Sequence, residues 1–162
     1  YARCDDARNR MPKRRARLAR RAVAYLAKHC RATRNGHLIE SAARILDRSG
    51  HLSEARDLFG EVLLMDPHSI DARLGLVVTL LREGRPGEAL PHLKWLVEIM
   101  PRDPEVLRLS IQAGKYEGDL EFAEAAYSRL QRLMPALAIP MRRFLDGPTI
   151  SGRGRLPPAL PR

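Results

Sequence analysis

The sequence of 162 residues lacks the features that define several large classes of protein. No segment approaches the roughly 20 consecutive apolar residues that a membrane-spanning helix needs. Nor does a charged and then apolar leader with a small-residue cleavage site open the chain. Two cysteines, Cys4 and Cys30, are too few for a disulfide scaffold or a zinc site of paired cysteines. Aromatic residues make up only 5%, and the 44% hydrophobic content at this length fits one ordinary domain, which excludes a large multidomain enzyme.

Acidic residues are scarce at both ends of the chain, and this scarcity accounts for the net charge of +10. Residues 1–35 hold 12 lysines and arginines against 2 acidic residues, and residues 138–162 hold 5 against 1. Residues 36–137 hold 12 against 16, so the middle of the chain is mildly acidic. The basic character therefore points to the termini, and not to the middle, as the place where an anionic partner would bind.

The middle of the chain repeats itself with a period of 34 residues. Each copy carries a glycine, then an alanine five residues later, and a proline near its end. Three further columns are apolar in every copy. The six columns are Gly50, Gly84 and Gly118; Ala55, Ala89 and Ala123; Phe59, Leu93 and Tyr127; Val62, Leu96 and Leu130; Met65, Ile99 and Leu133; and Pro67, Pro101 and Pro135.

These columns suit a helix-turn-helix unit. The glycine stands where a first helix ends and a left-handed backbone is favoured. The alanine allows two helices to approach closely, the large residue four positions later fills the space between them, and the proline closes the unit. Asp103 followed by Pro104 is typical of a helix start.

With these residues, units 36–69, 70–103 and 104–137 resemble tetratricopeptide repeats. The resemblance rests on the small residue, the large residue four positions on, and the final proline. The tryptophan expected early in the first helix is replaced by Ile39, Arg73 and Leu107, and the glycine in the middle of that helix by Ala43, Val77 and Ile111. The resemblance implies an all-α, right-handed helical solenoid whose first helices line a concave face.

The flanking segments divide the chain further. Residues 1–35 form a basic segment in which 12–33 read as one amphipathic helix, with Arg17, Arg20, Arg21, Lys28 and Arg31 on its charged side. This helix is read as a degenerate half-repeat that caps the solenoid, or as a helix that binds phosphate groups of lipid or nucleic acid through residues 13–34, and the two roles are compatible. Residues 138–146 are expected to hold a short capping helix, beginning at Met141 because Pro140 interrupts the register.

The remaining residues, 147–162, read as a flexible tail or linker. Within it, residues 155–161 carry the pattern of a polyproline ligand, which is also common by chance in proline-rich linkers.

Residues for catalysis or metal binding do not converge in this sequence. The histidines are scattered, none stands four residues from another histidine or a cysteine, and no glycine-rich phosphate loop follows a strand. We therefore expect a protein that is not an enzyme and that needs no cofactor or metal.

A partner site is predicted where one copy is apolar and its neighbours are polar. Leu74, Val78 and Leu81 in the middle unit replace Glu40, Arg44 and Asp47 in the first and Arg108, Gln112 and Lys115 in the third. The resemblance places these columns on the concave surface, and Arg48 and Arg82 are counted among the residues of the predicted groove. The stripe would bind a peptide or helix, or be covered by a terminus of the same chain. Trp95 replaces Glu61 and Arg129 and is expected near the surface as a possible contact.

The sequence thus favours an adaptor or scaffold that holds a segment of another protein in its concave groove, in a bacterial assembly. The alternative class is a module that docks on acidic lipid or nucleic acid, and self-association is also open. The cytoplasm is the expected location, with the membrane surface and the periplasm left open. Because the chain begins with Tyr1, it is read as a processed product or a fragment, and one variant makes its basic start a juxtamembrane segment.

Overall fold

The computed structural model describes Tyr25, Lys28 and residues 35–147. Within these residues the chain is entirely helical apart from its turns, as the sequence predicts. The helices are α2 (Gly36–Arg48), α3 (Leu52–Met65), α4 (Ile70–Arg82), α5 (Pro86–Ile99), α6 (Pro104–Glu117), α7 (Leu120–Leu133) and α8 (Pro135–Asp146). Each 34-residue unit therefore contains one even-numbered helix followed by one odd-numbered helix. No helix among the described residues is long and apolar enough to cross a membrane.

The even-numbered helices of the three units begin at equivalent capping residues. Asn35, Ser69 and Asp103 each accept a hydrogen bond from a backbone N–H of the first turn, which satisfies donors that the helix itself leaves unpaired. The turns within the units contain Gly50, Gly84 and Gly118, whose φ angles are 82°, 73° and 89°. The left-handed conformation predicted for these glycines is confirmed.

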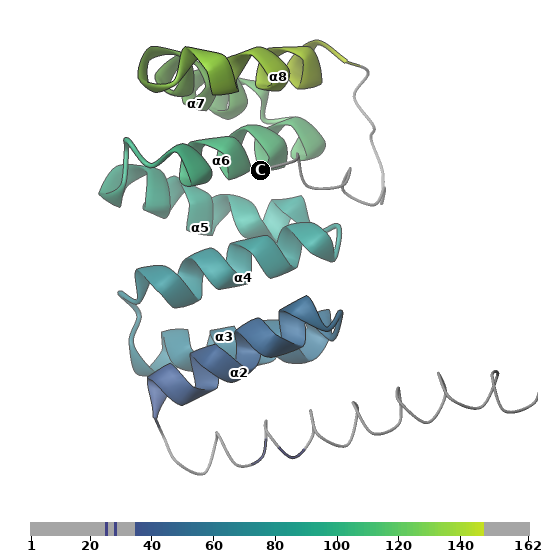
Figure 1. The fold of residues 1–162 in the computed structure, drawn as a ribbon, viewed down its shortest axis with the longest axis vertical. Helices are drawn as coiled ribbons and strands as arrows, with labels where there is room; N and C mark the ends of the chain where they lie inside the picture. Colours follow the sequence, from purple (N-terminus) through teal and green to yellow (C-terminus); the bar gives the residue numbers. More distant parts are fainter. Residues whose placement is uncertain (1–24, 26–27, 29–34, 148–162) are drawn as a thin grey trace, which may run out of the picture.

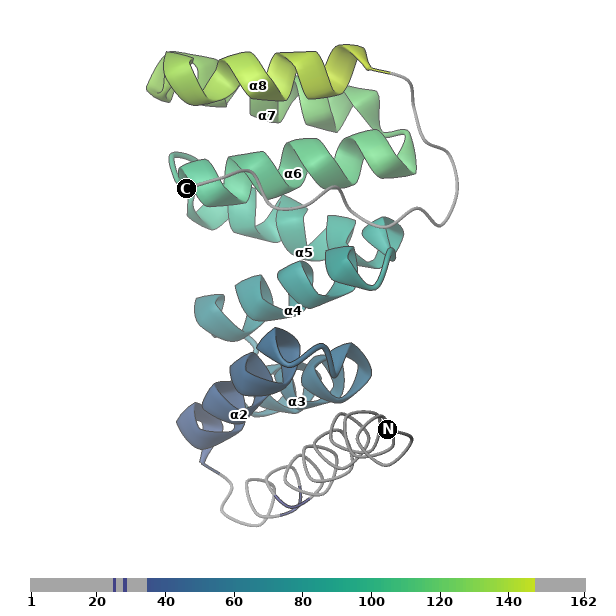
Figure 2. The ribbon, with the colours of Figure 1, turned by 45° about the vertical axis from the view of Figure 1, so that its right-hand side comes forward.

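The helices stack in two layers. In Figure 1 the even-numbered helices lie in the nearer layer and the odd-numbered helices behind them, and Figure 2 shows the same order along the stack. Each helix packs mainly on its neighbours in sequence, and in addition α2 contacts α4, α4 contacts α6 and α6 contacts α8. The even-numbered layer is therefore the more closely packed of the two. The right-handed sense implied by the resemblance stays a prediction.

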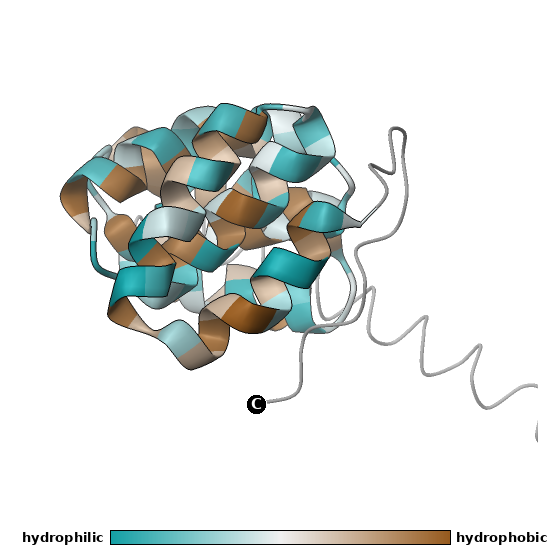
Figure 3. Ribbon diagram, turned by 90° about the horizontal axis from the view of Figure 1, so that it is seen from above, coloured by the Kyte–Doolittle hydropathy of each residue, from teal (hydrophilic) through white to brown (hydrophobic). Residues whose placement is uncertain are grey.

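The core consists of two clusters of buried residues, and α6 contributes to both. Val106, Leu109 and Ala113 face a cluster that extends back to α2, whereas Leu107 and Ile111 face a cluster with α7 and α8. Viewed from above, the helices that can be seen carry both hydrophobic and hydrophilic residues (Figure 3). Such amphipathic faces supply most of the stability of short helices.

The expected start of the last helix is wrong. α8 begins at Pro135, not at Met141, and Pro140 lies inside it. The cause lies at residue 137, where leucine occupies the column of the capping residues Ser69 and Asp103. Without a cap there, the helix starts at Pro135, which suits a first helical position. Pro140 removes one backbone hydrogen bond, and the burial of Ala138 and Met141 offsets that loss.

Candidate functional site

Leu74 and Val78 lie one turn apart on α4 and line a surface pocket of about 210 Å³. Both side chains are partly buried and pack against the core. The rest of the pocket consists of Phe59 and Gly75 together with charged residues of α2 and α4. Two of the three apolar residues predicted to form the groove floor are therefore brought together in a concave site.

Gly75 shapes this pocket from below. A side-chain Cβ at Gly75 would lie only 2.5 Å from the ring atoms Cε1 and Cζ of Phe59. Phe59 is 1% exposed, so its ring has little freedom to move away. Glycine at this position therefore lets the aromatic ring of α3 reach the base of the pocket, where it supports Leu74 and Val78.

The charged residues around the pocket are largely paired within the chain. Arg44 contacts Glu40 at 2.7 Å and Asp71 at 3.4 Å, and Arg82 forms an ion pair with Asp47. Asp47 also accepts a hydrogen bond of 3.1 Å from Thr79.

Arg48 completes the predicted basic rim of the pocket and differs from the other charged residues there. It is exposed, and the structure gives it no ionic partner among the described residues. Among the charged residues that line the pocket, Arg48 is therefore the one without an ion pair within the described part of the chain.

Leu81 and Lys115 do not belong to this surface, contrary to the sequence-based expectation. Leu81 is 3% exposed and Lys115 is 4% exposed. Their column lies where successive even-numbered helices meet: Asp47 reaches Thr79 of α4, and the Nζ atom of Lys115 donates to the carbonyl oxygen of Gly147 at 2.8 Å. Burial disfavours the ammonium ion and lowers the pKa of Lys115.

Three further groove candidates lie away from the pocket or are already paired. Arg82 is exposed but tied to Asp47, and Arg108 contacts Glu105 at 2.6 Å one turn earlier on α6. Gln112 is half-buried on the same helix. A role for these three residues in binding stays a prediction.

Trp95 is half-buried and lies beneath an arginine. The guanidinium carbon of Arg73 is 4.1 Å from the centre of the Trp95 ring, and the ring of His68 lies 6.4 Å away. Arg73 also contacts His92 Nδ1 at 3.2 Å, while its buried Nε atom has no hydrogen-bond partner. Burial, and secondarily the charge of Arg73, lower the pKa of His92. The guanidinium of Arg73 therefore covers one face of the Trp95 ring.

The basic residues proposed for anion binding lie mostly outside the described part of the chain. Arg17, Arg20, Arg21 and Arg31 belong to that group, as do Cys4, Cys30 and the proline-rich segment 155–161. Lys28 is described, and it is helical and exposed. Among the described residues, no group of three or more histidine, cysteine, aspartate or glutamate side chains is arranged to hold a metal ion.

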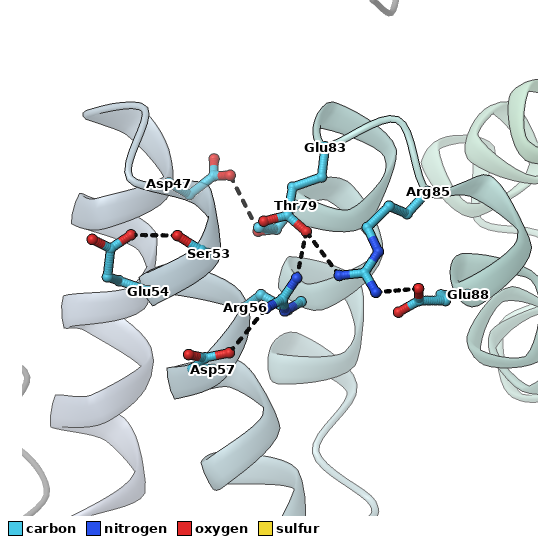
Figure 4. A network of polar contacts seen from close by, with 9 residues as sticks. All are labelled: Asp47, Ser53, Glu54, Arg56, Asp57, Thr79, Glu83, Arg85 and Glu88. Carbon is cyan, nitrogen blue, oxygen red and sulfur yellow. Dashed lines mark hydrogen bonds and ion pairs between the residues drawn. The ribbon is translucent and has the colours of Figure 1, made fainter. Parts of the chain in front are cut away.

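A second depression, of about 500 Å³, lies on the other side of α4, between α3 and α5. Leu76 and Leu80 form part of its wall, and Arg56 and Glu88 are among its charged residues. These charges belong to a chain of ion pairs in which Arg56 contacts Glu83 at 2.9 Å, and Arg85 bridges Glu83 and Glu88 (Figure 4). Polar contacts on this side therefore connect three helices of the array to one another.

The array of paired helices with a glycine turn in each unit is the architecture that the sequence resemblance implies. Residues 46–113, which extend from the end of α2 into α6, match the tetratricopeptide repeat family. This segment belongs to that family. Tetratricopeptide repeats are helical modules that bind other proteins, and the matched segment contains the apolar floor of the pocket. No curated protein matches the chain.

Proposed function

We propose that this protein is a non-catalytic adaptor that holds a segment of another protein in the pocket formed by α2, α3 and α4. The observation that carries the proposal is the combination of Leu74 and Val78 at the pocket floor with Arg48, which has no ionic partner among the described residues. Its family supports an interaction role, because tetratricopeptide repeats act by binding proteins.

The size of the pocket indicates the kind of partner. Small-molecule sites typically enclose about 300–1,000 Å³, and this pocket of about 210 Å³ is smaller. It is wide enough for one or two apolar side chains of a peptide. Arg48 would pair with a carboxylate beside them, because a guanidinium binds a carboxylate in a planar, two-pronged geometry. The expected ligand is therefore a helix or extended peptide with an apolar residue next to an acidic one.

The pocket on α4 is favoured over the larger depression between α3 and α5 because one of its charged residues, Arg48, has no ionic partner in the described part of the chain. In the larger depression Arg56 and Glu88 already have ionic partners within the chain. A partner would have to displace those pairs and would gain little in exchange. At the α4 pocket, a partner's carboxylate would bind Arg48 without displacing an ion pair between described residues.

A displayed library of random 12-residue peptides, selected on the full chain, provides the probe for the test. Selected peptides are expected to share an apolar residue with a nearby carboxylate and to lose about tenfold or more in affinity on Arg48→Glu. Leu74→Ala should weaken binding as well, mainly through faster dissociation. The control is Arg102→Glu, which reverses an exposed arginine in the turn before α6. Selected peptides that bind the Arg48→Glu and Leu74→Ala variants at full strength would refute the proposed site.

The charge of residues 1–35 supports a second candidate function, docking on an anionic surface. This segment carries 12 basic residues against 2 acidic ones. Binding to vesicles with anionic lipid or to RNA should then fall steeply with added salt, and reversal of Arg17, Arg20 and Arg21 to glutamate should abolish it. Arg48→Glu should leave that binding unchanged. The cytoplasmic location and the bacterial assembly expected from the sequence stay predictions under either function.

A further inference from the structure

One face of α2 is apolar and exposed, although the same face is buried in both later units. Leu38 is 49% exposed and Ile45 is 53% exposed. The residues 34 and 68 positions later are fully buried: Ala72 and Val106 in the column of Leu38, and Thr79 and Ala113 in the column of Ile45. The exposed face of α2 therefore has the register of a helix-packing surface, with no helix placed on it among the described residues.

In the later units the preceding odd-numbered helix covers this face. α3 packs on α4, and α5 packs on α6. On α4 the contact is made by Phe59, whose ring lies against Gly75 between the columns of Ala72 and Thr79. A large side chain from the preceding helix thus fills the centre of the face.

The chain itself contains the segment that would cover α2 in the same manner. A shift of 34 residues takes α3, Leu52–Met65, onto residues 18–31, and it takes Phe59 onto Tyr25 and Gly75 onto Ser41. Tyr25 would therefore lie over Ser41, between Leu38 and Ile45. The link from residue 31 to α2 has four residues, the same number as the link between α3 and α4.

The local structure at both sides of this predicted contact agrees with such docking. Asn35 caps α2 as Ser69 caps α4, so the chain enters both helices in the same way. Tyr25 is helical, and its side chain is 64% exposed. In the arrangement that the structure shows, the aromatic residue and the apolar face of α2 are thus both open to solvent, and their contact would remove both exposures.

The position of Arg21 in the repeat also agrees with the docking of residues 18–31 on α2. Arg21 occupies the column of Ala123, and Ala123 packs against Gly114 of the even-numbered helix in its own unit. In residues 18–31 that column would point away from α2. A basic residue there would face solvent once the opposite side of the segment is buried.

We propose that the exposed face of α2 is a docking site for residues 18–31 of the same chain, which close over Leu38 and Ile45 as an additional odd-numbered helix. This surface is separate from the α4 pocket, and the proposal does not depend on the adaptor function. Docking would place the basic residues of this segment on the outer face at this end of the array. Terminal repeats of such proteins need a polar outer face for solubility.

Hydrogen exchange on the full chain tests the proposal. Amides of residues 18–31 should be protected in the unaltered chain, and Leu38→Glu combined with Ile45→Glu should reduce that protection about tenfold or more. The amides of α4 to α7 should keep their protection. The matched control is Ile139→Glu on α8, because Ile139 is 60% exposed and its column holds Asp71 and Glu105 in earlier units.

Tyr25→Glu tests the same contact from the opposite side and keeps the test decisive if the α2 double variant unfolds. It should release residues 18–31 to the same extent while leaving α2 to α8 folded. Unprotected amides in 18–31 of the unaltered chain, or protection that neither set of substitutions lowers, would overturn the proposal. Sedimentation equilibrium adds a further criterion: a concentration-dependent dimer that Leu38→Glu with Ile45→Glu dissociates would mean that the face binds a second copy instead.

Discussion

The ring of Phe59 on α3 occupies the space that a side chain at position 75 of α4 would need. The two helices belong to different repeat units, so this contact fixes the spacing between units as well as the depth of the pocket. It is also the contact from which the docking position of Tyr25 on α2 follows.

Gly75→Ala should therefore destabilise the fold. A methyl group at this position would lie 2.5 Å from two atoms of the Phe59 ring, and overpacking of this kind typically costs about 1–3 kcal/mol. The free energy of unfolding from urea denaturation measures the effect. Peptide binding should weaken as well, because the displaced ring would enter the pocket.

Gly60→Ala is the control for this substitution, because Gly60 lies inside α3 with no atom within 4 Å of a Cβ position. Alanine there should stabilise the protein by about 0.5–1 kcal/mol through its higher helix propensity. Shifts of the same sign for both variants would contradict the assigned packing of Gly75.

The pKa of His92 predicts a loss of stability in mild acid. Burial lowers this pKa in the folded state below its ordinary value of 6.5, and Arg73 lowers it further. Below pH 6.5 the unfolded chain therefore binds the proton more readily than the folded chain, so the free energy of unfolding falls as the pH decreases. His92→Leu should flatten this part of the profile, since leucine occupies the equivalent position 58.

Arg73→Leu separates the two causes. It removes the weaker contribution to the pKa shift and leaves the burial of the imidazole, so most of the slope below pH 6.5 should persist. If the His92→Leu profile matched the unaltered one, the acid-dependent loss would have to come from another group.

Lys115→Met should loosen α8. The ammonium group donates hydrogen bonds to carbonyl oxygens at the end of α8, among them those of Phe144 and Gly147. Loss of the donor leaves these carbonyls without a charged partner, at a cost of about 1–3 kcal/mol. Hydrogen exchange should accelerate in α8 and remain unchanged in α2 and α3, because contacts in the array are local.

Lys94→Met provides the comparison. Lys94 pairs with Asp119 at 3.0 Å, but its side chain is 55% exposed. Exposed pairs contribute at most about 1 kcal/mol. Equal effects of the two lysine substitutions on thermal stability would argue against the capping role of Lys115.

Asp103 should stabilise the start of α6 more than Asn35 stabilises the start of α2. Asp103 accepts two backbone hydrogen bonds of 2.9 Å, whereas Asn35 accepts one of 3.4 Å. Asp103→Ala should cost about 1 kcal/mol and Asn35→Ala clearly less, as measured by thermal denaturation. The reverse order would indicate that the geometry of α2 at its start is tighter than the structure shows.

Much of the fold follows from the period of 34 residues. Gly50, Gly84 and Gly118 mark the turns, and Asp103 with Pro104 marks a helix start, because these residues act through the local backbone. The predicted start of α8 is wrong because that prediction treats Pro140 as a helix breaker. A proline in the second turn costs one hydrogen bond, and tertiary burial can offset that cost, which a local rule does not capture.

The pocket was predictable in part. Leu74 and Val78 differ from the polar residues in the same columns, and that contrast identifies the floor. Leu81 also differs from the polar residues in its column, but it is buried. The last turn of each even-numbered helix packs against the following even-numbered helix, which covers this column. The sequence comparison overlooked Gly75, although an isolated glycine inside a helix commonly has a packing reason.

Two ion pairs, Arg44 with Asp71 and Arg82 with Asp47, connect α2 directly to α4 and bypass α3. Three of these residues, Arg44, Asp47 and Asp71, also line the pocket, so electrostatic ties between partly exposed groups help set the width of its mouth. Salt screens such ties, whereas it leaves apolar contacts such as that of Phe59 with Gly75 largely unaffected. Added salt should therefore loosen the contact between α2 and α4 and leave the packing of α3 on α4 largely unchanged.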